Sequence, residues 1–318
     1  MLRKVMWFSL LISVFLVLLL PVCAADADGA MNFLVVGTDD AAENADVIII
    51  ARCDLRNSEI NVFQVPRDTY YRFGKGQNKL NQYFAFARAE NQDKREVLNS
   101  FSSVIAQQFG ITIDGSISLS TEGFTDIVDS YGGITIDMPY NYDFTDRDNN
   151  VVLSLKKGEN TLNANQALFF VRFRSGYSAG DIARLDAQKI FIKGFFRTVA
   201  TSGIEPLIKL PIKNDSICVD MPIFDLAKIF LKYRGKLNTT SLGFLTMPGK
   251  AVKSEGVWYY VLNKGAVFEV LCTYFNQTDN TFDEKMLFTD VNKPKINSIY
   301  TEKKDSFRCE ISEESLLN

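Results

Sequence analysis

The sequence of 318 residues contains no histidine. This absence excludes Ser-His-Asp and Cys-His catalytic arrangements and any zinc site with histidine ligands. The five cysteines are widely spaced and form no CxxC pair, so they do not predict a disulfide framework. We interpret them as ordinary thiols, with one disulfide between the later ones left open. Carboxylates, amides, hydroxyls, lysine and arginine must therefore carry any chemistry.

A large excess of charge of either sign is also missing. The 35 Lys and Arg residues nearly balance the 38 Asp and Glu residues, which leaves a net charge of -3. Because this balance gives no overall attraction to nucleic acid, we expect no nucleic-acid partner. An anion-binding site must instead be a local cluster of basic side chains. With 47% hydrophobic residues, the chain is long and apolar enough to bury a substantial core.

The first 25 residues have the pattern of a membrane anchor or an export signal. Two basic residues precede an apolar run from Val5 to Leu20. Counted through Ala25, about 20 nearly apolar residues are enough to cross a bilayer with the basic end inside. The small residues at 22–24 would be the cleavage site of a removed signal peptide. We therefore expect a single-pass protein of the cell membrane with its domain outside, or a secreted protein if the segment is cleaved.

Strand and helix patterns alternate from residue 31 to about residue 280. Short apolar or alternating runs predict strands over 32–36, 47–51, 59–65, 111–119 and 134–138. Helical patterns cover 80–109, 121–130, 163–171 and 181–200. The turn signal at 56–58 predicts an antiparallel hairpin over 47–65. This alternation predicts a mixed α/β fold, with helices flanking a central sheet that contains antiparallel strands. No linker divides 31–280, so we expect one domain, followed by a charged tail over 281–318.

Acidic residues crowd the loop between the first two predicted strands. Asp39, Asp40, Glu43 and Asp46 lie within eight positions. Hard carboxylate oxygens suit Mg²⁺, which usually takes one or two carboxylates together with phosphate oxygens. Acid-rich loops are also commonly solvated turns, and the loop alone does not separate the two interpretations.

Basic residues follow two of the predicted elements. Arg67 and Asp68 come directly after a strand that Pro66 ends, and Lys79 opens the next helical segment. Both basic groups could face one cleft. The competing interpretation is a pair of surface ion pairs, which contribute little to stability.

A second basic group surrounds residues 172–188. Arg172 and Arg174 share a face in extended backbone, and Asp181, Arg184 and Gln188 recur at i, i+3 and i+7 on one helix face. Guanidinium groups bind phosphate oxygens in pairs, and a helix start offers free amides. The set would suit a diphosphate, although a solvated helix face with an Asp–Arg pair remains the alternative.

Taken in this order, the segments resemble the LytR-CpsA-Psr family, the cell-wall glycopolymer ligases of mainly Gram-positive bacteria. The resemblance covers roughly residues 31–275. It consists of several short pieces: Gly37-Thr38-Asp39, Asp46-Val47-Ile48, 65–70, Lys79-Leu80-Asn81, 131–134, 158–174 and 181–188.

The resemblance implies one extracytoplasmic domain with a hydrophobic lipid pocket. It implies a phosphotransferase that moves a teichoic acid or capsular polysaccharide from an undecaprenyl-pyrophosphate carrier to peptidoglycan with Mg²⁺ (or Mn²⁺). The lipid is released as its phosphate. The implied site residues are Asp39 and Asp46 for the metal, Arg67, Lys79, Arg184 and Gln188 for the substrate, and Arg172, Arg174 and Asp181 for catalysis, with Asp181 as base or orienting group.

Departures from the family pattern occur at three positions. Asn44 stands where Arg is common, Ala187 where Arg usually precedes the Gln, and Ala164 where Gly is frequent. The phosphate site therefore carries less positive charge than usual. Two alternatives stay open: a pyrophosphatase of polyprenyl carriers that uses water as nucleophile, and a non-catalytic regulatory protein that binds polyprenyl phosphates.

The apolar faces of the predicted helices over 80–109 and 181–200 could line a lipid channel between helices and sheet. Apolar stripes at helical spacing are more often core than ligand tunnels. The sequence alone therefore leaves the position of a lipid pocket open.

Overall fold

The computed structural model describes residues 30–39, 44–54, 57–74, 78–145, 150–173, 181–208, 216–221, 241–254 and 256–276. The predicted N-terminal anchor and the predicted tail over 281–318 lie outside these residues. Within the described ranges, no helix is both long enough and apolar enough to cross a membrane.

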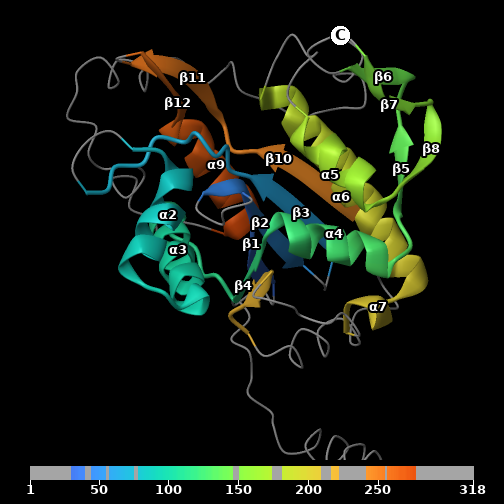
Figure 1. The fold of residues 1–318 in the computed structure, drawn as a ribbon. Helices are drawn as coiled ribbons and strands as arrows, with labels where there is room; N and C mark the ends of the chain where they lie inside the picture. The colour runs from blue at the N-terminus through green and yellow to red at the C-terminus, as the bar shows by residue number, and fades with distance from the viewer. Residues whose placement is uncertain are drawn as a thin grey trace, which may run out of the picture.

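A six-stranded sheet forms the centre of the molecule (Figure 1). Its strands lie in the order β10-β3-β2-β1-β4-β9. Their bounds are Met31–Thr38 for β1, Ala45–Asp54 for β2, Glu59–Gln64 for β3, Gly115–Leu119 for β4, Ile217–Val219 for β9 and Ser241–Thr246 for β10. β2 pairs antiparallel with both β1 and β3, as the predicted hairpin requires, whereas β4 is parallel to β1 and β10 is parallel to β3. The prediction of a mixed α/β fold is confirmed.

Four of these strands run in the same direction, so their carboxyl ends share one edge of the sheet. They end at Thr38, Gln64, Leu119 and Thr246. β2 and β9 begin at this edge because both are antiparallel to their neighbours. Ligands of open α/β sheets bind beyond the carboxyl ends of the strands. We refer to this edge as the carboxyl edge.

Helices flank the sheet on two sides (Figure 1). α2 (Leu80–Glu90), α3 (Lys94–Phe109) and α9 (Lys264–Phe275) lie on one side, and α4 (Thr121–Ser130), α5 (Ala164–Arg172), α6 (Asp181–Ser202) and α7 (Glu205–Ile208) lie on the other. The predicted helical segment over 80–109 divides in two. Asp93 caps α3 by accepting from the Arg95 amide at 2.8 Å, and Gly110 ends α3 with a φ of 62°.

Three two-stranded sheets complete the fold. They pair β5 (Ile134–Met138) with β8 (Gly158–Leu162), β6 (Tyr142–Thr145) with β7 (Val151–Leu155), and β11 (Gly249–Ser254) with β12 (Val257–Leu262). α6 packs closely on β5 because Gly194 has no side chain. A Cβ at Gly194 would lie 2.5 Å from the carbonyl oxygen of Thr135, so only glycine permits this approach.

The two faces of the central sheet are covered differently. The α3 face packs against α2, α3 and α9. The side chains at its centre are at most 1% exposed: Leu34, Val36, Ile50 and Phe63. The α6 face, which packs against α6, buries Ile49, Ile60 and Val62 but leaves its surrounding apolar side chains partly exposed. These are Val35, Val47, Cys53, Leu242 and Phe244 of the sheet and Ile192 and Phe196 of α6.

Candidate functional site

A chain of alternating charges lies at the carboxyl edge. Arg67 Nη1 donates a hydrogen bond to Asp46 Oδ1, and Arg67 Nε lies 3.8 Å from Asp68 Oδ1. Lys79 Nζ is 3.0 Å from the same Asp68 oxygen. Each of the four side chains keeps 19–22% of its surface exposed, so a ligand can reach them. The structure therefore brings Arg67 and Lys79 to the same carboxylate, that of Asp68. We refer to this partly exposed group of charges as the cleft.

The backbone between β3 and α2 holds these side chains in place. The Thr69 amide and hydroxyl both donate to the carbonyl of Pro66, at 2.9 and 2.5 Å. The amide of Leu80 then donates to the carbonyl of Thr69 at 2.7 Å, and that of Asn81 to the carbonyl of Arg67 at 3.2 Å. The start of α2 is thereby tied to the turn that carries Arg67, which fixes Lys79 beside it.

Two polar atoms at this junction have no hydrogen-bond partner among the described residues. They are Arg67 Nε and Asn81 Oδ1, and both atoms are buried. Buried polar groups are nearly always hydrogen-bonded, so unsatisfied ones need a specific explanation. A bound ligand with acceptor and donor oxygens, such as a phosphate next to a hydroxyl, would satisfy both.

The two predicted metal ligands flank the loop beside this cleft. Asn44 closes the loop by donating from Nδ2 to Asp39 Oδ2 at 3.0 Å, and the Asp39 amide donates to the Asn44 carbonyl at 3.2 Å. Asp46 lies at the start of β2 against Arg67. Asn44, where the family commonly has Arg, thus positions a carboxylate. Asp40 and Glu43 lie outside the described residues.

Asp39 and Asp46 fit the way in which proteins hold Mg²⁺. Within the part of the chain that the structure describes, no group of three or more acidic or thiol side chains could hold a metal ion. Mg²⁺ rarely needs such a cage, because it usually binds one or two carboxylates and completes its shell with phosphate oxygens and water. Asp46 beside Arg67, with Asp39 at the other end of the loop that Asn44 closes, offers that partial set.

On the other side of the carboxyl edge, Arg172 and Gln188 have different surroundings. Arg172, the last residue of α5, donates from Nη1 to Thr121 Oγ1 at 3.4 Å. Gln188 is only 6% exposed. Its Nε2 donates to the Val171 carbonyl and its Oε1 accepts from Gln64 Nε2, both at 3.3 Å. Gln188 therefore joins α6 to α5 and to the end of β3, which is a positioning role.

The remaining predicted residues lie at the start of α6. The helix begins at Asp181, as predicted. The side chains of Asp181 and Arg184 and the whole of Arg174 lie outside what the structure describes. Ala187, where Arg is usual in the family, is 3% exposed and packs in an apolar cluster with Phe170 and Phe191. Ala187, which lacks the positive charge of the usual Arg, therefore contributes to an apolar contact between α5 and α6.

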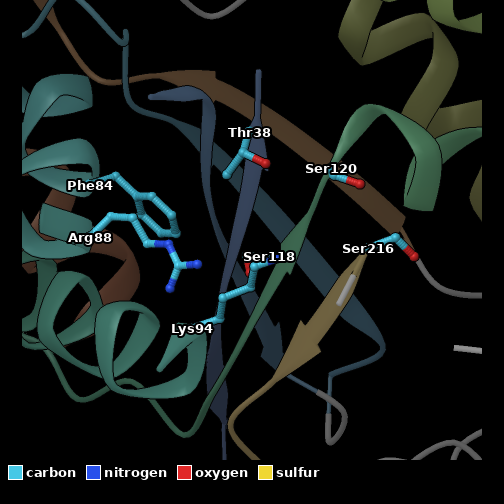
Figure 2. Close-up of a pocket in the computed structure, with 7 residues that line it drawn as sticks. All are labelled: Thr38, Phe84, Arg88, Lys94, Ser118, Ser120 and Ser216. Atoms are coloured by element: carbon cyan, nitrogen blue, oxygen red, sulfur yellow. The ribbon is translucent and has the colours of Figure 1, made fainter. Parts of the chain in front are cut away.

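Two further cations were not singled out from the sequence. Figure 2 shows Arg88 of α2 and Lys94 of α3 pointing toward the strand that carries Ser118, beside a cavity of about 20 Å³. Thr38, the residue before Asp39, lines the same cavity. The positions of Arg88 and Lys94 in the sequence did not indicate a site, because these residues approach β1 and β4 only in the folded chain.

Comparison with known proteins gives consistent matches. A family model described as the LytR_cpsA_psr family matches residues 18–275. The polyisoprenyl-teichoic acid–peptidoglycan teichoic acid transferase TagU of Oceanobacillus iheyensis is 25% identical over 247 residues, which cover 74% of this chain and 72% of the relative. TagU of Bacillus subtilis is 25% identical over 248 residues, 75% of each chain. The crystal structure of a transcriptional regulator from Enterococcus faecalis has a TM-score of 0.67 at 18% identity, covering 88% of this chain and 100% of that one.

Proposed function

The chain belongs to the LytR-CpsA-Psr family, and we propose that it is a phosphotransferase that moves a glycopolymer from an undecaprenyl-pyrophosphate carrier to peptidoglycan. The polymer would be of the teichoic acid or capsular type. Relatives named as peptidoglycan teichoic acid transferases support this proposal. The observation that carries it is the charge chain from Asp46 through Arg67 and Asp68 to Lys79 at the carboxyl edge. The segment over 1–25 would hold the domain at the outer face of the cell membrane.

In the proposed reaction, an acceptor hydroxyl oxygen attacks the phosphorus nearest the polymer. The bond from that phosphorus to the bridging oxygen breaks, and the lipid leaves as a monophosphate. Negative charge grows on the leaving oxygen, so the cations of Arg67, Lys79 and Arg172 stabilise the transition state more than the ground state. The hydroxyl proton would pass to a carboxylate, for which we propose Asp181 at the start of α6.

Asp39 and Asp46 would hold Mg²⁺ (or Mn²⁺), which when bound offsets the charge of the phosphate oxygens. The protein supplies the rest of the positive field. Arg67 and Lys79 each have a carboxylate partner in this structure, so their charge is balanced until a ligand arrives. A pyrophosphate would compete with Asp46 and Asp68 for the same donors, and its higher charge favours the exchange.

The α6 face is the proposed location of the lipid chain. Its partly exposed apolar side chains include Val35 and Val47 on the sheet and Phe196 on α6. On the α3 face most apolar side chains belong to the buried core, and the partly buried ones, such as Tyr83 and Phe268, lie around it. A polyprenyl chain lying along the α6 face would bury apolar surface at about 25 cal/mol per Å². Its pyrophosphate would then reach the carboxyl edge, where Gln188 joins α6 to β3.

The proposal is tested with purified protein, a polyprenyl-pyrophosphate-linked polymer, a peptidoglycan acceptor and Mg²⁺. Formation of a covalent polymer–wall product and release of lipid phosphate are both measured. Arg67→Ala should lower the rate by about 10²–10³-fold, because one preorganised donor to the transition state is lost. Arg197→Ala is the matched control, since Arg197 is 58% exposed and pairs loosely with Glu159 at 3.7 Å.

The assay also separates the alternatives. Release of lipid phosphate without any polymer–wall product would identify a pyrophosphatase. Binding of the lipid without release would identify a regulatory binding protein. Equal rates for Arg67→Ala and Arg197→Ala would contradict the proposed role of the charge chain.

A further inference from the structure

α2 and α3 pack side by side on one flank of the sheet (Figure 1). Side chains of both helices line an open groove between them. Its volume is about 270 Å³, close to the lower limit for pockets that hold small organic ligands. It is lined by Tyr83, Phe86, Ala87, Glu90, Asn91, Glu96, Val97 and Ser100. The α2 residues among them recur at i, i+3, i+4 and i+7, so one continuous stripe of α2 forms a wall of the groove.

Aromatic side chains give the groove an apolar wall. Phe86 is 41% exposed, one of few large hydrophobic side chains left so open. Its ring is held by Phe73, with centroids 5.2 Å apart, and by Tyr83 at 5.9 Å. Tyr83 is held in turn by a hydrogen bond between its hydroxyl and Ser100 Oγ at 3.0 Å. The exposed ring is therefore fixed in position, as a binding surface requires.

The charged side chains of the groove lining are both acidic, and its other polar groups are neutral. Glu90 and Glu96 contribute carboxylates, Asn91 contributes an amide, and no described lining residue is a lysine or arginine. Like charges placed together repel, so this groove disfavours a phosphate-bearing polymer. It favours a neutral or amine-bearing ligand whose hydroxyl and amide groups donate hydrogen bonds while an apolar face rests on Phe86. Sugar rings have this combination of surfaces.

The position of the groove relates it to the charged cleft. Tyr83 is one helical turn beyond Lys79, and Glu90 follows two turns later on the same stripe. With a rise of 1.5 Å per residue, these residues lie about 6 and 16 Å from Lys79 along the axis of α2. A chain of sugars in the groove would therefore extend from the cleft along the flank of the molecule.

We infer that the α2–α3 groove binds the amino-sugar chain of the wall acceptor and presents its hydroxyl to the cleft. This inference rests on the proposed function and assigns the acceptor to a surface separate from the phosphate site. The cleft attracts the anionic donor, and the acidic groove rejects it. The difference in charge therefore directs the donor to the cleft and the acceptor to the groove.

The experiment measures binding of an oligomer of N-acetylglucosamine to the full chain by titration calorimetry. The wild-type chain should bind it, and Phe86→Ala should weaken binding at least tenfold. Glu90→Gln and Glu96→Gln should weaken it less, because an amide still accepts hydrogen bonds. Val151→Ala is the control, since Val151 is an exposed apolar residue on β7, 58% exposed against 41% for Phe86, and does not line the groove. Unfolding midpoints of all variants verify that the fold is kept.

A second measurement separates this inference from the proposed function. Phe86→Ala should lower transfer to the wall acceptor by at least tenfold but leave the affinity for the polyprenyl-pyrophosphate donor, measured without acceptor, unchanged. No binding of the oligomer to the wild-type chain, or equal binding by Phe86→Ala and Val151→Ala, overturns the groove assignment. Absence of a polymer–wall product when the wild-type chain is given donor, acceptor and Mg²⁺ instead overturns the proposed function, whatever the groove binds.

Discussion

The two faces of the central sheet differ in how completely helices cover them. On the α3 face, Phe63 of β3 and Phe101 of α3 are at most 1% exposed and belong to one continuous core cluster. On the α6 face, Phe244 of β10 and Phe196 of α6 pack only at the margin of a small buried centre. Strands buried on both faces need apolar residues on both, whether the cover is protein or ligand. The α3 face is therefore the main source of stability, and the α6 face is the proposed location of the lipid.

The largest effect that tests this comparison is on folding stability. Phe101→Ala should lower the free energy of unfolding by about 3–5 kcal/mol, because it removes a fully buried ring and leaves a cavity. Phe244→Ala should cost only about 1–2 kcal/mol, because part of its ring is exposed before the change. Denaturation in guanidinium chloride measures both. Equal losses for the two variants would contradict the difference between the faces.

A smaller effect concerns the thiol of Cys53, which packs at the margin of the α6 face. Burial raises the pKa of Cys53 to about 12, with Arg52 opposing and Asp114 adding to the shift. The thiolate is the reactive form, so at pH 8 alkylation should be about 10³-fold slower than in the unfolded chain. The rate should rise about tenfold per pH unit up to about pH 11, as deprotonation approaches the raised pKa.

Reaction of Cys53 with iodoacetamide, followed by mass spectrometry of its peptide, measures this rate. The urea-unfolded chain is the control. If Cys53 reacted equally fast in the folded chain, water would reach this end of the α6 face. Burial would then not raise the pKa of the Cys53 thiol.

The smallest effect concerns the joint between the α6 face and the cleft. Gln188→Leu should lower the free energy of unfolding by about 1–3 kcal/mol, because the Val171 carbonyl loses its donor in a buried place. Gln107→Leu on the exposed side of α3 is the control and should change stability little. Affinity for a polyprenyl pyrophosphate, measured on the folded fraction, should fall only modestly. A large loss of affinity without loss of stability would mean that Gln188 binds the substrate directly.

Several features of the fold were predicted from local sequence. The hairpin of β2 and β3 followed from alternating apolar residues around a turn, and α6 begins at Asp181 as expected. The helical character of the segment over 80–109 was predicted from its periodicity, and in the structure Asp93 caps α3 and Gly110 ends it. These predictions held because turn and capping chemistry acts over a few residues.

The candidate site was predicted less completely. Arg67 and Lys79 were expected to share a cleft, and they are joined through Asp68. Gln188 was expected at the substrate, but its amide bridges Gln64 and Val171, which are far from it in the sequence. Arg88 and Lys94 were not predicted as part of a site. Their approach to β1 and β4 depends on how the two helices pack on the sheet.

The sequence by itself determined the class of chemistry and the class of fold. Because the sequence has no histidine, carboxylates, amides, hydroxyls, lysine and arginine must carry the chemistry. Apolar residues that recur with a period of two or of 3.6 residues indicated the strands and helices. Tertiary structure decided which charges meet, which face of the sheet stays partly open, and that acidic and aromatic side chains form a groove between α2 and α3. The reason is range: periodicity and capping act between neighbours in the chain, whereas ion pairs and grooves depend on distances that only the packed elements set.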